Sequence, residues 1–323
     1  MKEERNYSID LLKFICAVLV VFLHTPCIYH KFINPITRCA VPCFFIISGY
    51  LLYNKNGINP ERLKRNLVHI LNINIGATLL FALIKEVLSL QKGEVYIPTS
   101  KELFNFLLFN ENPFMYHLWY LSAYLYVLII IYFINKYKIW KYLFYLIPIL
   151  LLSDCIFGKY SLLLFNKEFP TIYVRNFICV GIPYFAMGAL IKKTTTYIPQ
   201  KTKLWGIGIF IFSLTSIAEK TFLYYIGKDA TRPHYISTTF LSICLFLFMI
   251  SYKTKSTWFS TSGEKDSLYI YLFHPLFIWL LSPLIYKHSP TIIIQVYNWI
   301  APFVFLGITI LFIYIIRKIH LIK

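Results

Sequence analysis

The chain has 323 residues, of which 58% are hydrophobic and only 14% are charged, and its mean hydropathy is +0.62. This composition excludes a soluble globular domain and is typical of a polytopic membrane protein. The net charge of +18 comes from Lys and Arg residues in short segments between apolar runs. That distribution fits the positive-inside rule better than it fits a nucleic-acid-binding surface, so we expect no nucleic-acid partner.

The apolar runs predict an all-α bundle of about ten transmembrane helices. We expect one integral membrane domain over residues 1–323, with no soluble domain and with the lipid bilayer as its surroundings. The longest break, residues 91–114, contains "KELFNFLLF", which predicts a short interfacial helix. The ten predicted spans cover residues 8–29, 36–53, 66–90, 115–135, 139–156, 172–192, 203–225, 234–252, 267–287 and 290–316.

The charge distribution also predicts the orientation of the chain. An even number of spans places both termini on one side of the membrane. If that side is the cytoplasm, most of the 32 Lys and Arg residues fall in inner segments. The positive-inside rule therefore favours cytoplasmic termini.

The first span, "SIDLLKFICAVLVVFLHT", carries three polar side chains on one helical stripe. Asp10 lies one turn before Lys13, and His24 follows Lys13 by about three turns, or roughly 16 Å. Polar groups at membrane depth are costly, so each requires a partner or a function. The stripe predicts an acid and a base at the cytoplasmic end of the first span, which is called the inner mouth below. It also predicts an imidazole near the outer end of that span.

Other polar residues gather at the predicted outer ends of later spans, and each also has an ordinary interpretation. Arg38 and Arg175 can snorkel outward, His117 and Trp119 can be interface residues, and Glu219 can pair with Lys220 in a loop. His274, two turns into span nine, can bond a carbonyl freed by Pro275. In span two, "TRCAVPCFFIISGYLL" predicts a bend at Pro42 and a close helix approach at Ser48 and Gly49. The seven cysteines form no zinc pattern, so we expect no metal.

In the order "IDLLKFICAVLVVFLH", "RCAVPCFFIISGYLL", "HLWYL", "RNFICVGIPYFAMGALI" and "SLYIYLFHPLF", the chain resembles the acyltransferase-3 family of integral membrane acyltransferases. The resemblance implies a ten-helix bundle in a bacterial cell membrane. It also implies transfer of an acyl group, usually acetyl from cytoplasmic acetyl-CoA, to a hydroxyl of an envelope glycan or a small molecule. The family's first helix carries an Arg, ten further residues and then a His; here Lys13 replaces the Arg, which keeps the charge but loses the bidentate fork.

The resemblance together with the depth and charge of the polar residues gives each candidate residue an expected role. His24 is the expected general base, Arg38 the expected oxyanion partner, and His274 a second catalytic histidine. We expect the donor's phosphates at a basic inner mouth and the acceptor among the outer residues. The donor-site candidates are Asp10, Lys13, Arg62, Lys64 and Arg65, and the acceptor-site candidates are Ser48, His117, Trp119, Arg175 and Glu219.

Two other functions fit the same residues. The chain also resembles the membrane half of membrane-bound serine racemases, which implies a carrier of an L-serine-like amino acid without acyl transfer. A third class is an export partner of a polysaccharide system. Many family members carry a fused extracytoplasmic domain that is absent from this sequence, so a separate extracytoplasmic transferase or polysaccharide-assembly protein is an expected partner.

Overall fold

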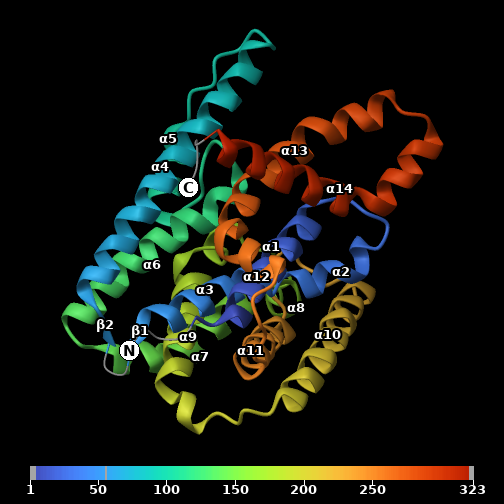
Figure 1. Cartoon of the computed structure of the whole chain (residues 1–323). Helices are drawn as coiled ribbons and strands as arrows, with labels where there is room; N and C mark the ends of the chain where they lie inside the picture. Colours follow the sequence, from blue (N-terminus) through green and yellow to red (C-terminus); the bar gives the residue numbers. More distant parts are fainter. Residues whose placement is uncertain (1–4, 55–56, 320–323) are drawn as a thin grey trace. The chain divides into compact units, whose positions relative to one another are not determined.

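The computed structural model describes residues 5–54 and 57–319 and is almost entirely helical (Figure 1). Among these residues, nine helical segments are long and apolar enough to cross a membrane. A tenth apolar helix, α11 (Ile236–Ser251), has 16 residues and is shorter than those nine. The prediction of an all-α polytopic membrane protein is confirmed.

Contacts divide the described chain into two compact units. Unit 1 contains residues 5–44, 200–222 and 235–319, and unit 2 contains residues 45–54, 57–199 and 223–234. The helices of unit 1 are α1 (Tyr7–His24), α2 (His30–Thr37), the start of α3 (Ala40–Leu52), most of α10 (Thr202–Tyr225), α11, α12 (Trp258–Lys265), α13 (Ser267–His288) and α14 (Thr291–Lys318). Unit 2 contains the rest of α3, β1 (Tyr53–Asn54), β2 (Gly57–Ile58), α4 (Pro60–Leu90), α5 (Ser100–Phe109), α6 (Trp119–Lys136), α7 (Trp140–Phe157), α8 (Ser161–Phe165) and α9 (Ile182–Thr194), with short helical turns at Tyr116–Leu118, Thr171–Tyr173, Phe177–Gly181 and Thr195–Tyr197.

The core of unit 1 forms where α1 packs on α13 and α14. Its buried members are Phe14, Ala17 and Val21 of α1, Ile270 of α13, and Tyr297, Ala301, Phe305 and Ile313 of α14. In Figure 1 the two C-terminal helices form a hairpin, and both contact α1. Helix α1 is thus held on its apolar faces, which leaves its ends available for polar side chains.

Helix α12 crosses α1 so closely that the backbones of the two helices are in contact. A Cβ atom on Gly263 would lie 1.8 Å from the carbonyl oxygen of Asp10, so no larger residue fits without displacing one helix. The contact places α12 against the first turns of α1. It therefore fixes the side chains at the inner end of the predicted polar stripe.

In unit 2, α3 and α9 make a similar close approach. A Cβ on Gly49 would lie 1.9 Å from the carbonyl oxygen of Phe185, and one on Gly188 would lie 2.0 Å from that of Ile46. Small residues at such a crossing allow two backbones to touch. The expected close approach at Gly49 is confirmed.

Several helix ends differ from the predicted ones for local reasons. Helix α1 ends at His24 because Pro26 holds Thr25 in an extended conformation. Span two is broken at Arg38 and Cys39, between α2 and α3. A proline removes the hydrogen bond to the carbonyl four residues before it and clashes with that carbonyl, and for Pro42 this residue is Arg38. The interruption therefore lies where a bend caused by Pro42 is expected.

The segment after α4 forms the expected short helix, α5. Thr99 and Glu102 form a capping box at its first turn. The hydroxyl of Tyr96 also donates to Glu102 at 2.9 Å. Burial and this contact raise the pKa of Tyr96 to about 12.

The orientation remains a prediction and can be tested by labelling. The termini, including Lys2 and Lys323, lie outside the described residues, so exposed positions in loops serve better. Lys92, after α4, is expected to face outward, and Lys193, at the end of α9, inward. Lys92→Cys should react with an impermeant maleimide on intact cells, and Lys193→Cys only after lysis. The reverse result would invert the orientation.

Candidate active site

The structure brings together two of the predicted catalytic histidines in unit 1. His24 ends α1 and His274 lies in α13, and their ring centroids are 5.5 Å apart at an interplanar angle of 30°. His274 is fully buried, and its Nδ1 lies 2.8 Å from the carbonyl oxygen of Ile270. Because a carbonyl only accepts, Nδ1 carries the proton and Nε2 of a neutral ring carries the lone pair. The pair can therefore accept a proton at the end of α1.

The third predicted catalytic residue, Arg38, also belongs to unit 1. It follows α2 directly, and its Nε donates to Oδ1 of Asn34 at 3.3 Å. This bond ties the guanidinium to α2, so Arg38 does not simply extend outward into water.

At the other end of α1 the structure shows an ionic cluster rather than a free base. Lys13 Nζ lies 2.9 Å from Asp10 Oδ1, and Arg5 Nη2 lies 3.0 Å from Asp10 Oδ2. Arg5 also contacts Glu264 of α12. The predicted acid and base lie together, and their ion pair occupies the charge of Lys13 that was expected to hold a phosphate.

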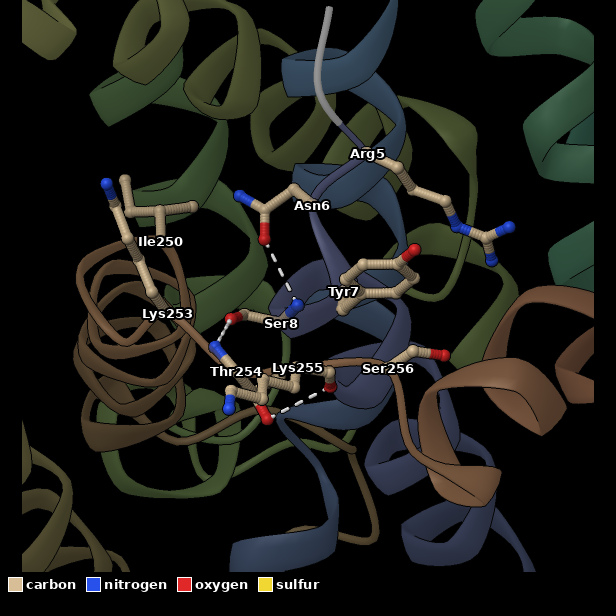
Figure 2. Close-up of a pocket in the computed structure, with 9 residues that line it drawn as sticks. All are labelled: Arg5, Asn6, Tyr7, Ser8, Ile250, Lys253, Thr254, Lys255 and Ser256. Atoms are coloured by element: carbon tan, nitrogen blue, oxygen red, sulfur yellow. Dashed lines mark hydrogen bonds between the residues drawn. The ribbon is translucent and has the colours of Figure 1, made fainter.

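A basic pocket opens beside this cluster, also within unit 1 (Figure 2). Its volume is about 540 Å³, and none of its lining residues is acidic. The residues that line it are Arg5, Asn6, Tyr7, Ser8, Ile250, Lys253, Thr254, Lys255 and Ser256. Ser8 accepts a bond from the backbone N–H of Thr254 at 3.1 Å, which joins the start of α1 to the segment after α11.

Two lysines supply the available charge of this pocket. Within residues 5–54 and 57–319, Lys253 and Lys255 form no ion pair, and both are exposed. Arg5 faces the pocket but is neutralised by Asp10 and Glu264. Sequence reasoning counted the two lysines only toward orientation, although "KTK" directly after a span is a usable sign of a cytoplasmic anion site.

Arg62, Lys64 and Arg65 lie in the first two turns of α4 in unit 2 and are exposed. Asp10 and Lys13 belong to unit 1. The sequence grouped all five residues in one donor site. That grouping remains a prediction.

Four of the predicted acceptor residues lie in unit 2. The guanidinium of Arg175 stands 5.5 Å from the ring centroid of Trp119, a cation–π arrangement. His117 is buried, with its ring edge-on to Phe81 at 5.1 Å. Ser48 bonds the phenol of Tyr124.

Glu219 has a structural position at the start of α11 in unit 1. Its two carboxylate oxygens accept from the backbone N–H groups of Ile236 and Ser237 at 3.0 and 3.2 Å. A carboxylate is favourable at a helix N-terminus because it satisfies donors that have no helical partner. Lys220, the next residue of α10, donates to the carbonyl of Lys31 at 3.1 Å.

Sequence reasoning missed a buried acid–base pair in unit 2. His234 Nδ1 lies 2.8 Å from Asp154 Oδ2, and both side chains are nearly inaccessible. The segment that ends at His234 is also fastened by Lys159 to Asp229 at 2.6 Å. Asp154 stands alone in the apolar run "LLLSDCIF", and an ionisable residue in a span was a sign that could have revealed it.

This pair predicts an asymmetric loss of stability. His234→Ala leaves a buried carboxylate without its partner and should cost about 3 kcal/mol or more. Asp154→Ala leaves a histidine that can become neutral, so it should cost less, about 1–3 kcal/mol. Thermal unfolding of purified protein measures both, with His69→Ala on the exposed face of α4 as the control. Equal losses for the two variants would contradict an ionic role.

No cluster of three His, Cys, Asp or Glu side chains suited to a metal ion occurs in the described part of the chain. Cys16, Cys39 and Cys43 are free and buried, as expected of small apolar residues.

Unit 1 thus combines paired histidines at one end of α1 with a basic pocket at the other. The profile of the acyltransferase domain family Acyl_transf_3 matches residues 6–318. The chain belongs to this family.

Comparison with known proteins also finds two amino-acid racemases of Enterococcus faecalis. Each is 26% identical to the chain, over 310 and 296 residues. The matches cover 86% and 83% of this chain but only 42% and 39% of the racemases, so the chain spans less than half the length of these relatives. No solved structure matches significantly.

Proposed function

We propose that the protein transfers an acyl group, most simply acetyl, from cytoplasmic acyl-CoA to a hydroxyl of a cell-envelope glycan or related acceptor. One observation carries this proposal: the basic pocket and the histidine pair lie at opposite ends of α1 in one unit. Helix α1 has 18 residues and is about 27 Å long. An acyl-CoA donor carries phosphates at one end and a thioester at the other. The phosphates would match the basic pocket, and the thioester would match the histidine pair.

The phosphate end of CoA is expected in the pocket of Figure 2. Lys253 and Lys255 supply positive charge, and Ser8, Thr254 and Ser256 supply hydroxyl groups. Charge-assisted bonds to phosphate are the strong ones, so the lysines would contribute most of the affinity. Lys13 and Asp10 would then orient Arg5 at the pocket wall.

The thioester end is expected near His24 and His274. In the transfer, a neutral imidazole takes the proton of the acceptor hydroxyl while its oxygen attacks the thioester carbonyl. The guanidinium of Arg38 stabilises the oxyanion that forms on that carbonyl. The thiolate of CoA leaves and takes up the proton, and the acyl group remains on the acceptor oxygen.

The direct test is transfer by purified protein in proteoliposomes. Acetyl-CoA is supplied on the inner face, with peptidoglycan fragments and capsular polysaccharide fragments as acceptors, and release of free CoA thiol is followed. Acceptor-dependent thiol release together with an acetylated product supports the proposal. Absence of both with every acceptor would reject it.

A second candidate is carriage of an L-serine-like amino acid, and the likeness to part of two amino-acid racemases keeps an amino-acid ligand in view. His24 and Arg38 would then hold the zwitterion without chemistry. Uptake of labelled L-serine into the same proteoliposomes, without thiol release, would favour this function.

A further inference from the structure

The side chains of His30, Asn34 and Arg38 form a series of polar contacts along α2, and Arg38 is the last member. Arg38 Nε lies 3.3 Å from Asn34 Oδ1, and Asn34 Nδ2 lies 3.2 Å from His30 Nε2. His30 Nε2 also lies 3.1 Å from the carbonyl oxygen of Leu23, in the last turn of α1. All four residues belong to unit 1.

The donor and acceptor roles along this chain follow from Arg38. A guanidinium has only donors, so the atom of Asn34 that faces it must be the amide oxygen. The amide nitrogen of Asn34 then faces His30 and donates to it. His30 Nε2 must therefore carry its lone pair for the chain to be complete.

The same nitrogen, Nε2 of His30, also contacts the carbonyl oxygen of Leu23. The carbonyl of Leu23 is one of the last in α1 and has no helical donor. It can accept from His30 only if Nε2 carries a proton. One ring nitrogen cannot serve Asn34 and Leu23 at once, so the arrangement has two mutually exclusive settings.

The charged and titratable groups around His30 do not fix its proton. Its own helix supplies Lys31 and Arg38, and α1 supplies His24, one residue after Leu23. Cys27 lies in the connecting loop and is bonded by the backbone N–H of His30. Lys220 of α10 reaches the carbonyl of Lys31. None of these groups is a carboxylate.

We propose that His30 is a positioning residue that holds Arg38 in place through Asn34, and that the tautomer of its ring decides whether this support is made. The inference rests on the proposed role of Arg38 in transfer. With the lone pair on Nε2, Asn34 is held and holds Arg38. With a proton on Nε2, His30 donates to the carbonyl oxygen of Leu23, and the amide nitrogen of Asn34 loses its acceptor.

A double-mutant cycle separates this role from a structural one. His30→Ala should lower kcat by about 10-fold, because a bond in a chain that ends at a charged group is lost. Asn34→Asp places a carboxylate beside Arg38 that holds it without His30. In that background His30→Ala should leave kcat unchanged. Asn34→Ala should match His30→Ala alone.

If His30 only caps α1, its replacement would cost the same in both backgrounds, and the proposal would be overturned. A second measurement does not need activity. The 15N shifts of His30 should show a lone pair on Nε2 in the wild type and a proton there in Asn34→Ala. Identical shifts in the two proteins would overturn the relay, whereas absent transfer with the expected shifts would reject only the proposed function.

Discussion

His24→Ala is expected to lower acyl transfer by on the order of 10²–10⁴, the usual contribution of a general base. Insertion of α1 should not suffer, because the change removes a polar group from an apolar span. Binding of CoA should also be retained, since the pocket lies about 27 Å away along α1. Thiol release with a glycan acceptor measures the rate, and calorimetry with CoA measures binding.

The second histidine refines this test. His274→Ala should do less damage if His274 only orients its neighbour at 5.5 Å, and more if its Nε2 is the base. His69→Ala, an exposed histidine on α4, is the matched control and should keep full activity. Full transfer by His24→Ala would remove His24 from the mechanism. Mass spectrometry of the stalled enzyme would distinguish a base from an acyl carrier, since only the latter leaves acetyl on His24.

Replacing both Lys253 and Lys255 by alanine is expected to weaken CoA binding by about 10-fold or more for each lysine. A charge-assisted hydrogen bond contributes about 1.5–3 kcal/mol, and 1.4 kcal/mol corresponds to a factor of 10. The remaining affinity should depend less on salt, because two exposed charges are gone. Lys201→Ala, also exposed and predicted to be cytoplasmic, is the control for the change in net charge.

This measurement also decides between two positions for the donor. Lys13→Ala should weaken CoA binding if the phosphates contact the predicted mouth, and Lys13→Arg should then be tolerated. The bond from Lys13 to Asp10 at 2.9 Å argues for a smaller effect than that of the lysine pair. If Lys13→Ala lowers the affinity and the double lysine variant does not, the pocket of Figure 2 is not the donor site.

Much of the fold could be predicted because a bilayer imposes strong local rules. Backbone groups in lipid must be bonded within the segment, so each long apolar run becomes a helix. The end of α1 at His24 is also a local matter, fixed by Pro26. The break at Arg38 and Cys39 is local as well, because Pro42 removes the helical bond to the carbonyl of Arg38.

The sequence by itself determined the class of protein, the helices and the residue types available for chemistry, because hydropathy and spacing along one helix are local properties. It also placed Asp10, Lys13 and His24 on one stripe of α1. Tertiary structure decided which of these groups meet. It paired His24 with His274, and it brought the start of α1 to Lys253 and Lys255 to form a pocket. These two contacts join segments more than 240 positions apart in the sequence. Close packing such as that of Gly263 against the backbone of Asp10 brings such segments together, and no periodicity in the sequence encodes it.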